Sequence, residues 1–294
     1  MISRRGDISE MKKTNITRLP VVMRMALNTF FDIKTAPFDA GDYSRLKFGS
    51  DRVAREFGRK MADAFYATHH DDWMQPCVVI PAPSTTVPVA ATLLSHHFTN
   101  RLNSLLAHED KMPVEWTMVH RNMTYNNNYA DLPKEERQKL LAGDYIYINR
   151  DFVAGKFLIF IDDCTITGTH EDKISSFLAE EGLTNDHSFV CFAKYEGDDP
   201  SIEMRLNHVA IKTARDLIAI SHERGHQVTT RSLRLLLEHP ESDFEDLLDC
   251  APLSFIEDAY YASIVKGYNR HAPYAVNFNH LARRVGMGRP MDIR

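Results

Sequence analysis

The stretch Phe157 to Asp172 reads FLIFIDDCTITGTHED and joins an apolar run, two adjacent aspartates and a turn of small residues. Five consecutive apolar residues predict a strand covered on both faces, as is typical of a central parallel strand. The segment EDKISSFLAEEG then predicts a helix that ends at Gly182, and HSFVCFAKY predicts the next strand. Both aspartates are therefore expected at the carboxyl end of a parallel strand, where ligands of open α/β sheets bind.

The same order of elements occurs earlier in the chain. From Asp51, VAREFGRKMADAFYATHH has apolar residues at four-residue spacing and predicts an amphipathic helix, and PCVVIPAP predicts a strand. After Pro83 the pattern indicates a loop that leads into another helix, and LPKEERQKLLA predicts a further helix that stops at Gly143. This alternation predicts an α/β fold with a mainly parallel sheet flanked by helices.

The two ends of the chain differ from this central part. Residues 1–41 form an N-terminal extension whose apolar part, LPVVMRMALNTFFDI, fits a strand or a packed helix equally well. Capping-box patterns at Thr213 with Asp216 and at Ser242 with Glu245 each precede an apolar helical segment. We therefore predict an α/β core over 42–212 and a helical C-terminal subdomain over 213–294.

Composition excludes several classes of protein. The chain has 294 residues, 44% of them hydrophobic, and lacks both a run of eighteen apolar residues and a secretory leader, so a cytoplasmic protein without a membrane partner is expected. Its net charge of −5 is spread over interspersed acidic and basic residues, so no nucleic-acid partner is expected. The four cysteines form no CxxC pair, which argues against structural zinc and a disulfide framework.

The central stretch has the chemistry of a sugar-phosphate site. Where a turn of small residues opens a helix, the backbone N–H groups and the positive helix end attract an anion such as a phosphate. Asp162 and Asp163 can accept strong, charge-assisted hydrogen bonds from vicinal hydroxyls. The same two carboxylates favour Mg²⁺ near a diphosphate, bound directly or through water.

The strand, the acidic pair and the TGT turn resemble the phosphoribosyl-pyrophosphate (PRPP) motif of type I phosphoribosyltransferases (PRTases), and the resemblance extends more loosely over 42–211. It implies that Asp162 and Asp163 hold the ribose hydroxyls. The YSRLKFGS stretch (Tyr43 to Ser50) and the spelling TITGTHE are also similar to PRTase-like proteins encoded in tellurium-resistance gene clusters, which indicates nothing about the substrate.

The resemblance also assigns the other subsites. It implies a pyrophosphate loop in PAPSTT, a hood over 108–150 that closes over PRPP and includes Arg121 as a catalytic residue for the leaving group, and acceptor contacts from Lys194 and Tyr195. The residues implied for the 5′-phosphate are Thr165, Ile166, Thr167, Gly168, Thr169 and His170, and those implied for pyrophosphate are Ala82, Pro83, Ser84 and Thr85.

Two positions depart from the family pattern. Many members have threonine where this chain has His170, although histidine can also donate to a phosphate. Several nucleobase enzymes have an aspartate at the position of Ile166. Without that carboxylate, a base that deprotonates the acceptor must come from elsewhere, or the acceptor needs none.

These features predict a Mg²⁺-dependent phosphoribosyltransferase that transfers the ribose 5-phosphate of PRPP to an unidentified base or amine and releases pyrophosphate. The alternative is a PRPP-sensing regulatory protein that keeps the pocket but performs no transfer. For oligomeric state, the homodimer is the commonest arrangement among soluble enzymes.

A third reading comes from His222 to His226, HERGH, which matches the HExxH motif of zinc hydrolases. The motif requires both histidines on one face of a helix, and Gly225 is expected to end the helix before the second histidine. The adjacent pairs His69-His70 and His96-His97 can each supply one metal ligand at best, because neighbouring helical residues point in different directions. They are expected at solvated helix ends instead.

Overall fold

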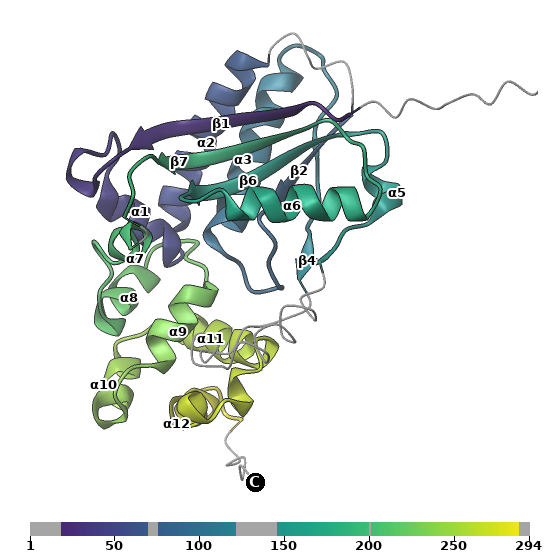
Figure 1. Cartoon of the computed structure of the whole chain (residues 1–294). Coiled ribbons are helices and arrows are strands. Elements are labelled where there is room, and N and C mark those ends of the chain that lie inside the picture. The colour runs from purple at the N-terminus through teal and green to yellow at the C-terminus, as the bar shows by residue number, and fades with distance from the viewer. Residues whose placement is uncertain (1–18, 70–75, 122–145, 200, 288–294) are drawn as a thin grey trace, which may run out of the picture.

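The protein, described here by a computed structural model over residues 19–69, 76–121, 146–199 and 201–287, has a five-stranded sheet at its centre (Figure 1). The strand order is β1-β7-β6-β2-β3, and every neighbouring pair runs parallel. The sheet and its flanking helices confirm the predicted α/β fold. The strands are β1 (Val22–Phe30), β2 (Cys77–Pro81), β3 (Glu115–Trp116), β6 (Phe157–Thr165) and β7 (His187–Tyr195).

Strand β6 occupies the middle of the sheet, between β7 and β2. Its first five residues, FLIFI, are all buried, because helices cover both faces of the sheet at this point. The strand continues through the two aspartates to Thr165. The acidic pair therefore lies at the carboxyl end of the central strand, as the sequence predicts.

Helices cover the two faces of the sheet unequally. On one face, α2 (Asp51–Thr68) and α3 (Ala90–Ala107) pack over Val79, Ile159 and Phe192. On the other, α6 (Thr169–Glu180) and the short α5 (Arg150–Val153) pack over Val78, Leu158 and Phe189. The α2 bounds confirm the helix predicted from Asp51. Figure 1 shows α6 crossing the front of the sheet, with α2 and α3 behind it.

The N-terminal segment, which fits a strand or a helix by sequence, forms the edge strand β1. It pairs in parallel with β7 over Val22 to Phe30. The chain then passes through the 3-10 turn η1 (Ile33–Thr35) into α1 (Ala40–Lys47), which Asp39 caps through Asp42 N–H at 2.7 Å. Helix α1 thereby starts below the carboxyl edge of the sheet.

The predicted hood, 108–150, contains a small ladder, and its residues 115–116 belong instead to β3 of the central sheet. Strands β4 (His120–Arg121) and β5 (Ile146–Tyr147) pair antiparallel, so the chain leaves the core and returns to it at one place. Residues 122–145, which include the predicted helix LPKEERQKLLA, lie outside the described residues.

The C-terminal part of the chain is helical. Its helices from α8 onward share an apolar cluster of their own, which includes Leu233, Leu236 and Phe278. Figure 1 shows them below the sheet. The elements are α7 (Ile202–Asn207), α8 (Ala214–Ser221), α9 (Thr230–Leu237), η3 (Glu241–Asp243), α10 (Phe244–Asp249), α11 (Leu253–Val265), η4 (Tyr268–Arg270), η5 (Ala272–Tyr274) and α12 (Ala275–Arg284).

The two predicted capping boxes have different outcomes. Thr213 and Asp216 form theirs, with the Asp216 N–H donating to Thr213 Oγ1 at 3.2 Å. The prediction of a capping box at Ser242 and Glu245 is wrong. Helix α10 starts at Phe244, so Ser242 is not its N-cap residue. The Glu245 carboxylate instead accepts hydrogen bonds from His280 and Arg284 of α12, and such charge-assisted bonds outcompete a local cap.

None of the helices in the described ranges is long and apolar enough to span a lipid bilayer.

Candidate functional site

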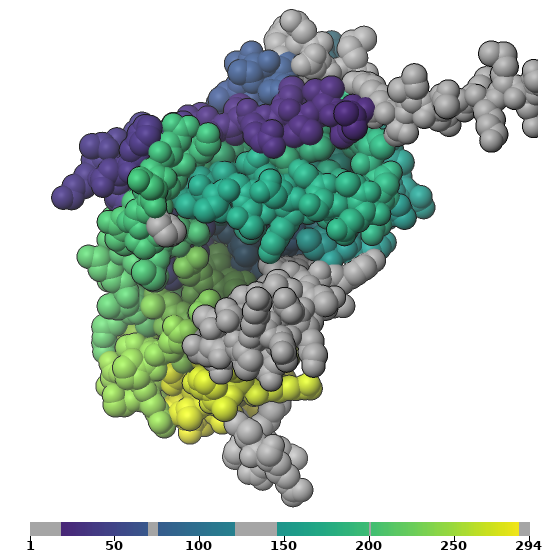
Figure 2. All heavy atoms as spheres, in the orientation of Figure 1, coloured from purple at the N-terminus to yellow at the C-terminus, as the bar shows by residue number. Residues whose placement is uncertain are grey.

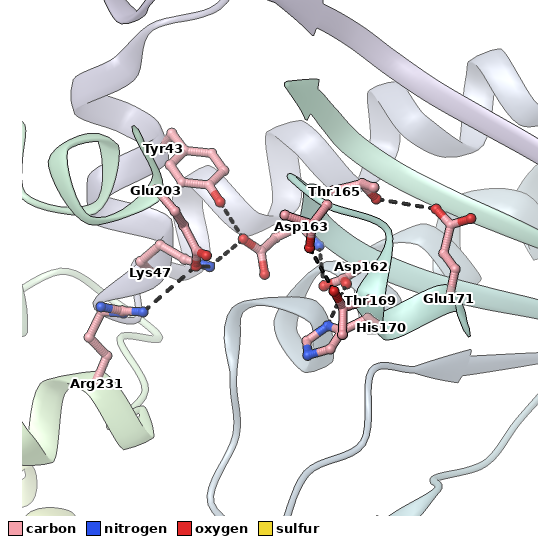
Figure 3. Close-up of polar contacts among 11 residues, drawn as sticks. Tyr43, Lys47, Asp162, Asp163, Thr165, Thr169, His170, Glu171, Glu203 and Arg231 are labelled. Carbon is pink, nitrogen blue, oxygen red and sulfur yellow. Dashed lines mark hydrogen bonds and ion pairs between the residues drawn. The ribbon is translucent and has the colours of Figure 1, made fainter. Parts of the chain in front are cut away.

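Asp162 and Asp163 point to opposite sides of the sheet, because successive side chains of a strand alternate. Figure 3 shows Asp163 directed toward α1 and Asp162 directed toward the start of α6. Asp163 is 7% exposed and Asp162 is half-buried. The acidic pair therefore provides two separate sites with different neighbours.

The Asp163 carboxylate is bound by two residues of α1. Its Oδ2 accepts hydrogen bonds from the Tyr43 hydroxyl and from Lys47 Nζ, the latter at 2.5 Å (Figure 3). Lys47 Nζ also lies 3.4 Å from Glu203 Oε1 of α7, and Arg231 of α9 lies 3.9 Å from the same oxygen. A chain of alternating charges thus runs from the strand end to the C-terminal helices.

The charges in this chain fix the protonation of Asp163. Burial alone would raise the pKa of Asp163, but the Lys47 ammonium, together with the Tyr43 hydrogen bond, holds the pKa below its ordinary value. Burial likewise lowers the pKa of Lys47, and the negative charge of Asp163 reverses that effect, so the net pKa is raised. Burial and the Asp163 charge raise the pKa of Tyr43 well above its usual value. Asp163 and Lys47 are therefore both charged at neutral pH, and Tyr43 remains a donor.

Asp162 faces the start of α6. Its Oδ1 accepts the Asp163 N–H at 2.8 Å, and its Oδ2 lies 3.1 Å from His170 Nδ1. Burial raises the pKa of Asp162, and the His170 hydrogen bond opposes this rise. The same hydrogen bond raises the pKa of His170, which favours its cationic form. A side chain that can carry a positive charge is thus placed in the first turn of α6.

The turn before α6 exposes the backbone. Gly168 adopts φ of 75°, a left-handed conformation that glycine tolerates best, and caps the helix. Within the described residues, no side chain makes a capping hydrogen bond there, so the N–H groups of the first turn remain available to an anion. The Thr167 and Thr169 hydroxyls lie 2.7 Å apart beside this turn.

The predicted pyrophosphate loop begins where β2 ends. The Ala82 N–H donates to Ile161 O at 2.9 Å, which ties the start of the loop to β6. Ser84 is 5% exposed, and its hydroxyl has no hydrogen-bond partner among the residues that the structure describes. Thr85 Oγ1 accepts from the Val87 N–H at 3.4 Å and from Lys266 Nζ of the C-terminal part at 3.5 Å. The loop and the acidic pair therefore meet at the same edge of the sheet.

The remaining predicted site residues are placed as follows. The half-buried Ile166 packs against the main apolar cluster. Lys194 is exposed and pairs with Glu196 at 3.0 Å, whereas Tyr195 is 6% exposed and its hydroxyl accepts from the Asp199 N–H. The Arg121 backbone lies in β4, and its side chain is outside the description.

The HERGH segment lacks the helical geometry of a zinc site. Helix α8 ends at Ser221, so both histidines lie beyond it. His222 Nε2 contacts Cys250 O at 3.0 Å, and His226 Nε2 contacts Phe48 O at 2.9 Å. The described residues contain no group of three or more His, Cys, Asp or Glu side chains that could hold a metal ion.

Comparison with known families agrees with the geometry of the central strand. A sequence model of the family described as PRTase ComF-like matches residues 21–281. The chain belongs to this family. The match confirms the type I PRTase resemblance that FLIFIDDCTITGTHED predicts, and it includes both the sheet and the C-terminal helices.

Among solved structures, the chain is similar to a hypoxanthine phosphoribosyltransferase from Staphylococcus aureus in two crystal forms. The tetragonal form is 13% identical with a TM-score of 0.32, and the orthorhombic form is 12% identical with a TM-score of 0.31. Each match covers 49% of this chain and 76% of the other. No curated protein sequence matches the chain.

Sequence reasoning missed four residues that the fold brings to the site. Tyr43 and Lys47 lie in YSRLKFGS, a stretch that stood out only as a resemblance. The other two, Arg231 and Lys266, come from the C-terminal helices. None of the four has a local sequence signal, because each reaches the site through a contact between distant parts of the chain.

Proposed function

We propose that the protein binds PRPP with Mg²⁺ and transfers its ribose 5-phosphate to a small-molecule acceptor, with release of pyrophosphate. The observation that carries this proposal is the position of Asp162 beside the open N-terminus of α6, with the Asp163 carboxylate next to it at the end of β6. Carboxylates bind vicinal hydroxyls and a helix N-terminus binds phosphate, so both halves of a sugar phosphate have partners. Membership of a PRTase family supports the same class of reaction.

In the proposed complex the acidic pair positions the sugar. Asp163 stays ionised beside Lys47 and accepts from a ribose hydroxyl rather than exchanging a proton with the acceptor. The N–H groups of the first turn of α6 and the His170 side chain bind the 5′-phosphate. The loop over Ala82 to Thr85 binds the diphosphate, and closure of the predicted hood, with Arg121, would exclude water from the reacting C1′.

The donor set suits a Mg²⁺ ion that is held largely by the substrate. Mg²⁺ in such sites typically binds one or two carboxylates together with substrate phosphates and water. Asp162 and Asp163 supply two carboxylates at the right edge of the sheet. When bound, the ion would neutralise charge on the diphosphate as pyrophosphate departs.

The proposal places the acceptor beside Ile166 and the end of β7. Ile166 is apolar where several nucleobase enzymes have a carboxylate, so the acceptor's proton has to pass to another group or to water. Lys194 and Tyr195, at the end of β7, are proposed to border the acceptor. Lys194 is the more accessible of the two, because the Tyr195 ring packs against Phe30.

The test is ³¹P NMR of the purified protein with PRPP and Mg²⁺, alone and with pooled nucleobases and amines. Pyrophosphate is expected to appear with one pool and the wild-type protein, and not with Asp162→Asn/Asp163→Asn. A matched control is Asp63→Asn, which removes an exposed carboxylate on α2. Failure of the wild-type protein to bind PRPP would refute the proposal.

The second candidate, a PRPP-sensing protein without transferase activity, is favoured by the absence of a carboxylate at Ile166. It predicts that PRPP binds and stays intact with every pool. It also predicts a change in oligomeric state or partner binding on addition of PRPP, which light scattering with and without PRPP would detect.

A further inference from the structure

The predicted pyrophosphate loop has no positive charge of its own. Residues 82–88 read APSTTVP, without lysine or arginine. A diphosphate carries several negative charges, and fixed cations near its oxygens stabilise it more strongly than N–H groups alone. A cation that serves this loop therefore has to come from another part of the chain.

Lys266 brings such a cation to the loop. Its Nζ lies 3.5 Å from Thr85 Oγ1, although the two residues are 181 positions apart. Lys266 is 9% exposed, so most of its side chain packs against protein, which restricts where its ammonium can lie. The same loop contains the buried Ser84 hydroxyl, which has no partner among the described residues. The Lys266 ammonium and the Ser84 hydroxyl are thus a cation and a hydrogen-bond donor at the same short loop.

The position of Lys266 is fixed by the helix that carries it. Lys266 is the C-cap of α11, and its N–H donates to Ala262 O at 3.0 Å. The next residue, Gly267, has φ of 70° and turns the chain away. A cation is favoured at a helix C-terminus, where the helix dipole is negative. The helix itself is anchored through Phe255, Ile256 and Ala259 in the C-terminal apolar cluster.

The C-terminal helices are also fixed to the loop. The Thr230 N–H of α9 donates to Pro88 O at 3.2 Å, and the loop residue Val87 is buried in the C-terminal apolar cluster. Figure 2 shows the green and yellow spheres of these helices continuing from the core as one body. Lys266 therefore approaches Thr85 from a framework that holds the loop in place.

We propose that Lys266 binds the diphosphate of PRPP and stabilises the pyrophosphate leaving group. This inference rests on the proposed function. As the acceptor's lone pair bonds to C1′, the C1′–O electron pair moves to the departing pyrophosphate oxygen, and the acceptor's proton passes to water. The Lys266 ammonium opposes the negative charge that develops on that pyrophosphate. The C-terminal helical part is thus a component of the active site.

The test is calorimetric titration, with Mg²⁺ present, of pyrophosphate, PRPP and ribose 5-phosphate into four proteins. These are the wild type, Lys266→Met, Lys266→Gln and the control Lys212→Met, which removes an exposed lysine next to the start of the C-terminal part. Both Lys266 variants are expected to lose affinity for pyrophosphate and PRPP by about 10- to 100-fold, the effect of one charge-assisted hydrogen bond. Ribose 5-phosphate affinity is expected to change less than about twofold, because that ligand lacks the diphosphate.

Each outcome decides one of the two proposals. Unchanged pyrophosphate affinity in the folded Lys266 variants, or equal losses for pyrophosphate and ribose 5-phosphate, would overturn the role of Lys266. So would a wild-type protein that binds no pyrophosphate. Wild-type binding of pyrophosphate but not of PRPP would overturn the proposed function alone.

A measurement on the wild-type protein removes the dependence on variant folding. Pyrophosphate is expected to protect Lys266 from acetylation by acetic anhydride at least several-fold, while Lys212 is labelled equally with and without it. Mass spectrometry of the digested protein reads both sites. Equal labelling of Lys266 in both conditions would overturn the proposal.

Discussion

Asp163 owes its charge to Lys47, a residue 116 positions earlier in the chain. A buried carboxylate without a cation would take up a proton, and a protonated acid would bind ribose hydroxyls less strongly than a carboxylate. Lys47 therefore does more than stabilise the fold. It keeps the end of β6 anionic, and Tyr43 fixes the same oxygen from a second direction.

This arrangement predicts the effect of Lys47→Met. The variant leaves Asp163 buried without its ammonium, so the free energy of unfolding is expected to fall by about 3 kcal/mol at pH 7. The double variant Lys47→Met/Asp163→Asn should lose clearly less than the sum of the two single changes, because both act on one interaction. Urea denaturation of the four proteins measures the coupling.

The pH dependence supplies the control for Lys47→Met. The pKa of Asp163 is lowered in the folded protein, so its contribution to stability is present above its ordinary pKa and is lost as the pH falls. In Lys47→Met the pKa of Asp163 should rise, because the largest interaction that opposes the effect of burial is removed, and the acid loss should begin at higher pH. The two side chains would be shown to be independent by two results: a double variant whose loss of stability equals the sum of the two single losses, and a stability at acidic pH that Lys47→Met does not change.

At the scale of elements, the strand, turn and helix over Phe157 to Glu180 decide the site, and Gly168 is the turn's critical residue. Gly155, before β6, has φ of 69°, and Gly168, after it, has φ of 75°. An added Cβ meets no atom within 4 Å at either position. The two glycines are therefore matched in backbone strain and differ in which end of β6 they occupy.

The pair gives a controlled prediction. Gly168→Ala and Gly155→Ala should each lower the free energy of unfolding by about 1 kcal/mol, because both force alanine into a left-handed conformation. Only Gly168→Ala should weaken ribose 5-phosphate binding, by about tenfold, because its methyl group enters the space beside the exposed N–H groups of α6. Thermal unfolding and calorimetric titration measure the two effects. Equal affinities in the two variants would place the phosphate elsewhere.

Elements with a local sequence signal were predictable. The apolar run, the glycine stops and the acidic pair located β6, α6 and the carboxyl edge of the sheet from one stretch of residues. Strand β1 was not predictable, because its pairing with β7 depends on residues more than 160 positions away. The Glu245 capping box failed for the same reason, since α12 supplied stronger partners for that carboxylate. The places of Lys47 and Lys266 in the site could not be predicted either, because both depend on contacts between distant segments.

At the scale of the whole molecule, the core and the C-terminal helices share a hydrogen-bonded boundary. Phe48 directly follows α1 and is fully buried in the C-terminal apolar cluster. Its carbonyl accepts from Ser232 Oγ at 2.9 Å, and the Gln227 N–H donates to Gly49 O at 3.0 Å. Since α1 also carries Tyr43 and Lys47, we expect a change in the C-terminal packing to affect the Asp163 site.

This boundary predicts that the two parts unfold together, and the tryptophans can test it. Trp116 lies in β3 of the core, and the other tryptophan of the sequence also precedes residue 213, so no tryptophan of the C-terminal part contributes to the fluorescence. Leu236→Ala, in the fully buried α9 face, should cost about 3 kcal/mol through the cavity that it leaves. If the parts are coupled, the urea midpoint of the tryptophan signal falls by about 1 M, and the midpoint of the helical signal in circular dichroism falls by the same amount.

The control is Leu253→Ala, at a residue of α11 that is 58% exposed, which should leave both midpoints unchanged. If Leu236→Ala leaves the midpoint of the tryptophan signal unchanged, the core folds independently. The C-terminal helices and the Lys47 region would then not be energetically coupled.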